Sequence, residues 1–307
     1  MLFVLFMLVV GIVLAPGEAH AWGPITHLAH GSQVLDDLTT AGGALQEILR
    51  QYWREYLYGC VGADITQAKK YTRAMQYHCH SWIVGWQVLA RAETDAQRAF
   101  GYGYLSHLAS DVYSHNHFVP TQLIVSYRGR GLRHVYWETR FDSLQAARYR
   151  DVLADLRRWR FPDCDLLVKD VVSRTLFSFR TNKRIFNSVL AWQQFEQWHS
   201  LMSRVSARSR FSLPIEVVPA YNRACVSSIG GLLRHGKHSG CQHADPTGTK
   251  AITLAKDIRR KLRVLLRRRQ ITPEIEREIR ELALQKNGPS LERGRPRTSR
   301  SRRAAAI

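Results

Sequence analysis

Histidine and acidic residues recur at helical spacing in the middle of the sequence. His107, Asp111 and His115 follow one another at intervals of four residues. Residues four apart are neighbours on a helix surface, so a helix here places the three side chains along one face. Imidazole and carboxylate together form a donor set that suits zinc. His117 comes two residues after His115, where we expect the helix to end before Pro120.

Further candidate ligands lie between residues 22 and 141. They are Trp22 and His27 near the start of this stretch, Asp64, the pair His78 and His80, and finally His134 and Glu138, which are again four residues apart. One histidine and one acid at helical spacing more often form a surface or core pair than a metal site. Several such groups in aromatic, apolar surroundings are different, because burying them unpaired is costly. The pattern therefore predicts a site for several metal ions.

The start of the chain has the features of an export signal. An apolar run from Leu2 to Ala15 is broken by Pro16 and Gly17, and residues 19–21 then have the small-x-small form that signal peptidase recognises. The run is too short for a membrane span, which needs about 20 residues. It departs from a typical signal peptide in one respect, because no Lys or Arg precedes it. We expect residues 1–21 to be a cleaved signal peptide, with an uncleaved anchor as the alternative. The protein is then exported, either to the periplasm or into the medium.

Charge is distributed unevenly along the 307 residues. The net charge is +20, and the stretch from Lys250 to Ile307 alone carries 18 Lys/Arg against 6 Asp/Glu. A hydrophobic content of 45% is ample for a sizeable core. The five cysteines form no CxxC pair, which excludes a cysteine-rich zinc module, and their odd number leaves at least one without a partner in the same chain.

Apolar residues recur with helical periodicity over long windows, for example from Asp95 to Tyr113, and no alternating strand pattern is evident. We therefore predict an all-α protein with one helical domain over residues 22–286, which carries the ligand motifs in residues 22–141. A glycine- and histidine-rich stretch, 230–248, is predicted to be a loop. Residues 287–307 are polar and arginine-rich, which predicts a basic disordered tail.

The stretch 250–286 is predicted to be helical, with a break near Thr272 and Pro273. Within it, residues 256–269 place apolar side chains on one face and many arginines on the opposite face. Such a helix either lies on an anionic membrane or covers the domain with a solvated basic face.

The order Trp, His, Asp, His, HxxxD, His, HxxxE resembles that of the bacterial zinc-dependent phospholipase C family, and more distantly that of the single-strand nucleases with the same trinuclear site. The likeness runs from Trp22 to about Phe141 and comprises seven elements in the same order. It implies a multi-helix phospholipase C-like bundle around a trinuclear site, with about three zinc ions per chain. The interval from Trp22 to His27 is nuclease-like, whereas Glu138 in the last motif is phospholipase-like.

The resemblance also implies which residues bind zinc. In the family the mature chain begins with a tryptophan whose α-amine and carbonyl are ligands, and cleavage after Ala21 would expose Trp22. His27 would join Trp22 on the first zinc, and Asp111 would bridge this ion to a second. The remaining implied ligands are Asp64, His80 and His107 on the second zinc, and His134 and Glu138 with either His115 or His117 on the third.

Two of these assignments remain open. His80 stands before Ser81 and Trp82 in the family's His-x-aromatic form, which favours it over His78. The helical face favours His115, whereas the spacing in the better-known phospholipases selects His117.

The resemblance implies a zinc-dependent phosphodiesterase that hydrolyses phospholipids, so the expected partner is a phospholipid or a membrane surface, and nucleic acid is less favoured. Zinc lowers the pKa of a bound water toward neutrality. Asp64 is the carboxylate that we expect to ligate this water or to accept its proton. A single-strand nuclease of the related trinuclear type, and a non-catalytic adaptor on the same fold, are the alternatives. Both C-type and D-type cleavage remain open.

Overall fold

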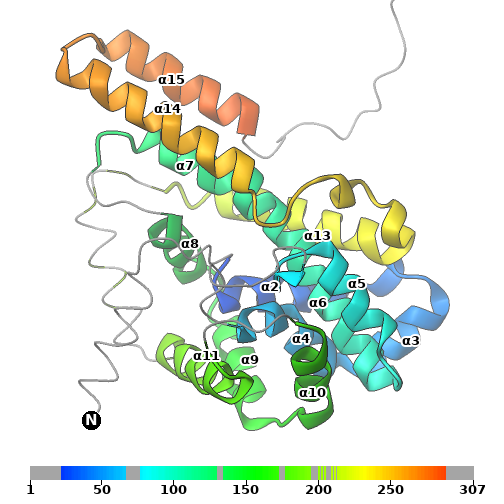
Figure 1. Ribbon diagram of the computed structural model, residues 1–307. Coiled ribbons are helices and arrows are strands. Elements are labelled where there is room, and N and C mark those ends of the chain that lie inside the picture. The colour runs from blue at the N-terminus through cyan, green and yellow to red at the C-terminus, as the bar shows by residue number, and fades with distance from the viewer. Residues whose placement is uncertain are drawn as a thin grey trace, which may run out of the picture.

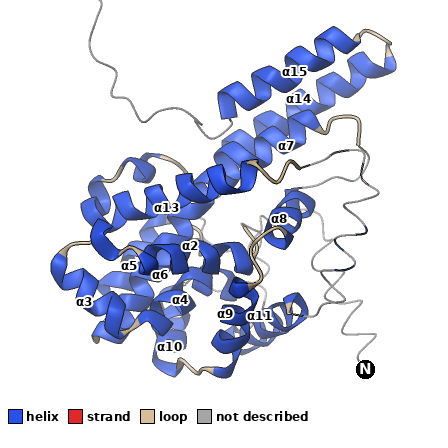
Figure 2. Cartoon of the chain, turned by 180° about the vertical axis from the view of Figure 1, so that it is seen from behind, coloured by secondary structure: helices blue, strands red, loops and turns tan. Residues whose placement is uncertain are grey.

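The computed structural model describes residues 22–66, 77–129, 134–172, 177–194 and 213–287, together with residues 200, 202, 204, 209 and 211. Helices make up most of this part of the chain and it contains no strand, which confirms the all-α prediction (Figure 2). None of its helices is long and apolar enough to cross a membrane. The predicted signal peptide and all but the first residue of the predicted tail lie outside the described residues.

Thirteen α-helices follow one another along the described chain (Figure 1). They are α2 (Pro24–Asp36), α3 (Gly43–Gln51), α4 (Trp53–Gly62), α5 (Trp82–Ala90), α6 (Asp95–Tyr113), α7 (Val119–Val125), α8 (His134–Ser143), α9 (Arg148–Arg158), α10 (Pro162–Val171), α11 (Phe179–Gln193), α13 (Val217–His235), α14 (Thr249–Arg267) and α15 (Pro273–Asn287). Short 3-10 turns are η1 (Leu38–Thr40), η2 (Ala63–Ile65), η6 (Gly236–His238) and η7 (Gly240–His243), and η5 (Ser114–Phe118) is a π-helix.

Helix α6 is the central element. Its start is fixed by a capping box, in which the Thr94 hydroxyl accepts the Gln97 N–H and the Gln97 side chain accepts the Thr94 N–H. From Ala99 to Val112 nearly every residue is buried, because α2, α4, α5 and α13 all pack against it. A helix that is covered on all sides belongs to the interior of a protein, and this one carries the predicted HxxxD motif.

Helices α4 and α6 touch through their backbones. A Cβ atom on Gly103 would lie 2.9 Å from both the Cys60 nitrogen and the Gly59 Cα, and closer still to the Tyr56 carbonyl oxygen. Any side chain at Gly103 is therefore excluded while the helices keep this separation. The close approach sets the position of α6 relative to the end of α4, from which Asp64 follows.

The helix was predicted to end before Pro120. Helix α6 does end at Tyr113, but the chain continues in helical conformation through Pro120, so the prediction that no helix passes this proline was wrong. The wider π-turn η5 follows α6 directly, and α7 then begins at Val119 with Pro120 in its first turn. Proline is tolerated in a first turn because its missing N–H would have no helical partner there. Single π-turns of this kind occur often at functional sites, and this one contains both His115 and His117.

The loop predicted over residues 230–248 is wrong for residues 230–235, because α13 continues to His235; residues 236–248 connect α13 to α14 through two short 3-10 turns. Gly230 is buried in the helix, and the sequence signal of glycine was misleading there. The predicted break near Thr272 and Pro273 is present between α14 and α15. All five cysteines lie among the described residues, and none of them is in a disulfide bond there.

Gly103→Ala should destabilise the protein, because overpacking of a close helix contact typically costs about 1–3 kcal/mol. Gly231→Ala is the matched control, since a Cβ atom there meets no atom within 4 Å and alanine is the better helix former. Urea unfolding of the two variants and the parent measures the effect. A Gly103→Ala protein as stable as the Gly231→Ala protein would show that α4 and α6 are not in backbone contact.

Candidate metal centre

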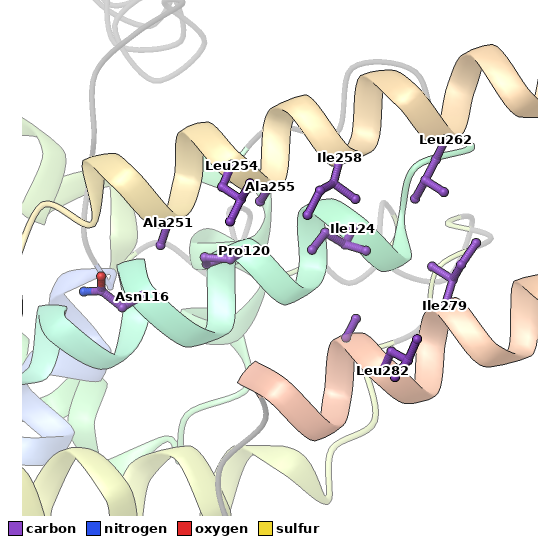
Figure 3. Close-up of a pocket in the computed structure, with 11 residues that line it drawn as sticks. Asn116, Pro120, Ile124, Ala251, Leu254, Ala255, Ile258, Leu262, Ile279 and Leu282 are labelled. Atoms are coloured by element: carbon purple, nitrogen blue, oxygen red, sulfur yellow. The ribbon is translucent and has the colours of Figure 1, made fainter.

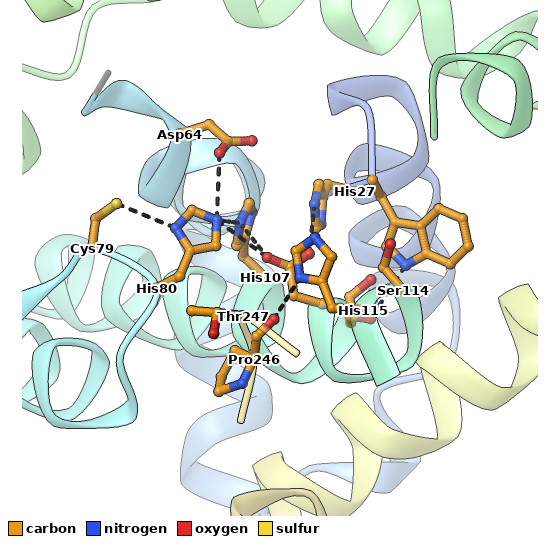
Figure 4. Close-up of polar contacts among 12 residues, drawn as sticks. His27, Asp64, Cys79, His80, His107, Ser114, His115, Pro246 and Thr247 are labelled. Carbon is orange, nitrogen blue, oxygen red and sulfur yellow. Dashed lines mark hydrogen bonds and ion pairs between the residues drawn. The ribbon is translucent and has the colours of Figure 1, made fainter. Parts of the chain in front are cut away.

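Four separate segments bring acidic and histidine side chains together in the interior. His27 comes from α2, Asp64 from η2, His80 from the residues just before α5, and His107 and Asp111 from α6. All are buried except Asp64, which is partly exposed. Figure 4 shows the labelled side chains converging from these elements.

Asp111 stands between two sets of donors. Its Oδ1 lies 3.2 Å from Nε2 of His27. Its Oδ2 lies 3.2 Å from Nε2 of His80 and 3.1 Å from Nε2 of His107. Asp64 completes the second set, with its Oδ1 3.5 Å from Nε2 of His80. One carboxylate therefore has each of its oxygens directed at a different group of nitrogens, which is the arrangement of a ligand that bridges two metal ions.

The tautomer of His107 follows from its hydrogen bond. Nδ1 of His107 lies 2.9 Å from the Cys60 carbonyl oxygen, which can only accept, so Nδ1 carries the proton. Nε2 then presents a lone pair toward Nε2 of His80, 3.0 Å away. Metal-binding histidines are commonly oriented in this way by a second hydrogen bond on the other ring nitrogen.

Several buried atoms of this cluster make no hydrogen bond within the described residues, although the Asp111 oxygens and Nε2 of His27 have ion-pair neighbours. They are Nε2 of His27, both carboxylate oxygens of Asp111 and Oε2 of Glu138. Burying such groups without hydrogen bonds is costly, and lone pairs of neutral imidazoles that face a carboxylate repel it. A cation among them would remove both penalties. The donor set of imidazoles and carboxylates fits zinc, so the residues present fit the metal.

The charges in the cluster support one another. Burial opposes ionisation of Asp111, but the adjacent His107 and His27 outweigh it and hold the pKa of this carboxyl well below its usual range. Burial likewise opposes a charge on His107, yet Asp111 and Asp64 raise its pKa. For His27 burial prevails, with help from His107 stacked 3.9 Å away, and its pKa is lowered. Asp111 is therefore a permanent anion in the interior.

His30 is a buried histidine whose role is structural, and it differs from the candidate ligands in its hydrogen bonds. Its Nδ1 lies 2.8 Å from the Ser110 hydroxyl and its Nε2 lies 3.0 Å from the Asn222 side-chain oxygen. Burial lowers its pKa to about 3, so it is neutral. Both ring nitrogens are already occupied, and His30 has none left for a metal.

A second buried pair lies next to the first cluster. Nε2 of His115 is 3.2 Å from Oε1 of Glu138, and the Ser114 hydroxyl donates to the same oxygen. Burial opposes protonation of His115, but Glu138 outweighs it and raises the pKa to about 9. The ring of His117 instead lies beside that of Tyr113, with centroids 5.2 Å apart. The π-turn thus directs His115, rather than His117, toward Glu138.

The other predicted ligands are placed as follows. Nδ1 of His78 accepts the backbone N–H of His80, so it supports the loop that presents His80. His134 is the first residue of α8, but its side chain lies outside the described part of the structure. The indole of Trp22 is buried, and its N–H donates to the carbonyl of Ser110, the neighbour of Asp111 in the chain.

Aromatic packing and a carboxylate hold the start of α2 against α8 and η5. The Trp22 ring packs on Phe141, with centroids 4.1 Å apart, and on Phe118 at 4.8 Å. Oδ1 of Asp142 accepts the N–H of Thr26 at 2.7 Å, where the first turn of a helix leaves donors free. Trp22 and His27 are thereby fixed beside the cluster.

A family model described as zinc dependent phospholipase C matches residues 26–202. The chain belongs to this family. The resemblance inferred from the sequence is therefore confirmed, and zinc is the metal on which the family depends. The matched residues include both donor groups. A search of curated proteins and a search of solved structures gave no match.

In this member of the phospholipase C family, a segment beyond the matched residues also builds the centre. Nδ1 of His115 donates to the Pro246 carbonyl at 2.6 Å, which leaves Nε2 facing Glu138. Gly248 has a φ of +56°, and a Cβ atom on it would lie 2.6 Å from the His115 carbonyl carbon and closer still to the His115 Cβ. Asp245 fixes this turn by accepting the N–H groups of Thr247 and Thr249.

Sequence analysis did not identify this turn as part of the site. The run Asp245-Pro246-Thr247-Gly248 is recognisable as a turn, but nothing in it indicates a contact with a histidine 131 residues away. The turn also borders a cavity of about 450 Å³, which is lined on one side by residues 78 and 80–83 and on the other by residues 242–247 and 249. His80 thus lies in the wall of an open pocket.

Gly248→Ala should lower the zinc content of this family member, because its methyl group collides with His115 and alanine is strained at positive φ. Gly240→Ala is the matched control, since a Cβ atom there meets nothing within 4 Å. Elemental analysis of the purified, folded variants measures bound zinc per chain. Equal zinc in both variants and the parent would show that His115 does not need this turn to bind metal.

Proposed function

We propose that this protein is an exported zinc-dependent phosphodiesterase that hydrolyses phospholipids. The observation that carries the proposal is the buried Asp111 carboxylate, shared by His27, His80 and His107, in a chain of the zinc-dependent phospholipase C family. A buried anion surrounded by imidazole lone pairs has no evident structural purpose without a cation. Next to it, an open cavity gives a substrate access to one side of the centre.

We propose that about three zinc ions bind. The first would be held by Trp22, His27 and Asp111, the second by Asp64, His80, His107 and Asp111, and the third by His115, His134 and Glu138. His115 is preferred to His117 because it lies within 3.2 Å of Glu138. His80 is preferred to His78 because its Nε2 faces both Asp64 and Asp111.

Bound zinc supplies a Lewis acid for the phosphate and makes a water more acidic. The chain's own residues have separate tasks. Asp111 is completely buried and serves as a fixed bridge, whereas the Asp64 side chain is 17% exposed and can meet water or substrate. Asp64 is therefore the carboxylate that we assign to orienting the attacking water or accepting its proton.

The predicted cleavage site is consistent with the same proposal. Cleavage after Ala21 would make Trp22 the first residue, and its new α-amine would lie at the start of α2 beside His27. The indole contacts of Trp22 would hold this terminus in place.

Asp64→Asn should keep the fold but lower the rate of phospholipid hydrolysis at least about hundredfold, because a positioned acid–base group contributes about 10²–10⁴-fold. Phosphatidylcholine hydrolysis is followed by identifying the released headgroup product, which also separates C-type from D-type cleavage. Asp155→Asn, at an exposed ion pair on α9, is the control and should be unchanged. Parent-like turnover of the Asp64→Asn protein would remove this residue from the reaction.

Elemental analysis and N-terminal sequencing of the same exported sample test the cofactor and the processing together. We expect about three zinc ions per chain and Trp22 as the first residue. Hydrolysis of single-stranded DNA but not of phospholipid would instead identify a nuclease. A folded sample without zinc would favour the non-catalytic adaptor.

A further inference from the structure

Helices α14 and α15, with the turn between them, form an arm that extends beyond the helices that carry the metal-binding groups (Figures 1 and 2). Both helices pack against α7. The arm comprises residues 249–287 and lies outside the residues matched to the family, 26–202. The family match therefore says nothing about the arm, whose features are argued from its own residues.

An apolar groove of about 370 Å³ runs between α14 and α15 with α7 as its floor (Figure 3). Its walls include Ile124, Ile258, Leu262, Ile279 and Leu282. The only polar side chain in its lining is Asn116, at the end where α14 begins. A groove of this composition is suited to a hydrocarbon chain and not to a polar ligand.

The rim of the groove combines exposed leucines with positive charge. Of the residues that line the groove, Leu254 is 62% exposed and Leu282 47%, and Leu265, further along α14, is 38% exposed. Lys261 stands three residues after Ile258 and four before Leu265, so it shares their side of α14. From residue 250 to residue 269 eight Lys/Arg are exposed, and Asp257 is the single acid. Helix α15 carries both acidic and basic side chains, so the positive potential of the arm comes from α14.

We propose that the arm docks the protein on an anionic phospholipid bilayer, with the mouth of the groove toward the membrane, Lys261 and the flanking basic residues of α14 at the headgroups, and an acyl chain in the groove. Positive charge next to exposed leucines is the combination by which helices bind anionic lipid surfaces. A second copy of this chain fits poorly, because two strongly basic helices would repel. Residues 288–307 fit poorly too, because they are polar and arginine-rich.

This inference deepens the proposed function, on which it rests for the phospholipid substrate. Asn116, at one end of the groove, is the neighbour of His115, and its side chain donates to the Asp245 carbonyl at 2.8 Å. The groove therefore ends at the turn that orients His115. Docking through the arm would keep the metal centre close to the lipid surface.

Vesicle co-sedimentation tests the proposal with a matched pair of double variants. The arm variant is Leu254→Ser with Lys261→Glu. The control is Leu166→Ser with Lys169→Glu on α10, at the opposite end of the molecule, where Leu166 is 53% exposed. The parent should bind vesicles containing phosphatidylglycerol more tightly than pure phosphatidylcholine vesicles. The arm variant's partition constant should fall about tenfold or more, and the control's should not change.

A second variant tests occupancy of the groove itself. Leu282→Trp adds a fluorophore there to the eight native tryptophans, so the parent's emission is subtracted. Phosphatidylglycerol with brominated acyl chains should quench this added emission more than the emission added by Leu166→Trp. Three results would overturn the proposal. The two tryptophan variants could be quenched equally, the arm variant could bind vesicles as well as the parent does, or the parent could fail to bind anionic vesicles. A change from dimer to monomer in the arm variant without loss of vesicle binding would also overturn it, since the occupant would then be a second copy.

Hydrolysis of a soluble short-chain phospholipid is measured on the same proteins. The arm variant should keep it, because neither substituted residue contacts the metal centre. Loss of vesicle binding with retained hydrolysis supports docking through the arm. Absent hydrolysis in the parent, together with intact vesicle binding, would instead count against the proposed function and in favour of the docking surface.

Discussion

The buried carboxylate of Asp111 is the constraint on which the rest of the structure depends. An ionised carboxyl group in the interior is tolerated only with positive or hydrogen-bonding partners on both oxygens. Those partners come from three places in the chain, on α2, before α5 and on α6 itself. The surrounding helices must therefore keep their relative positions, or the anion loses its partners.

The means by which the fold meets this requirement are visible in its backbone contacts. The glycine contact between α4 and α6 brings the Cys60 carbonyl within reach of His107 and so fixes the ring that faces Asp111. The Trp22 indole and the Asp142 carboxylate fix the start of α2. Each of these contacts is made by the backbone or by a side-chain atom that points away from Asp111. The imidazole nitrogens that face Asp111 therefore remain available. This arrangement is typical of sites in which outer hydrogen bonds orient the metal ligands.

Much of this was accessible from the sequence. The spacing of His107 and Asp111 required a helix with both side chains on one face, and the structure has that helix. The family order of motifs correctly indicated an all-α fold of the zinc-dependent phospholipase C family. These successes concern local periodicity and motif order, which a sequence records directly.

Other features depend on contacts that no local pattern records. The hydrogen bond of a π-turn spans one residue more than that of an α-turn, and neither Ser114 nor Phe118 is a sequence signal for it. This turn nevertheless decides that His115, and not His117, faces Glu138. The turn at Gly248 is recognisable, but its partner is far away along the chain. The glycines near residue 230 suggested a loop, and burial in α13 overrode their low helix propensity.

Burial has a consequence for the reactivity of two of the cysteines, Cys164 and Cys225. Burial raises the pKa of Cys164 and of Cys225 to about 12, so almost none of either is thiolate at neutral pH. Only the thiolate reacts readily with oxidants and disulfides. Exclusion from water, not pairing, thus keeps these two thiols unreactive. An oxidant would reach them only when the packing around α10 or α13 opens.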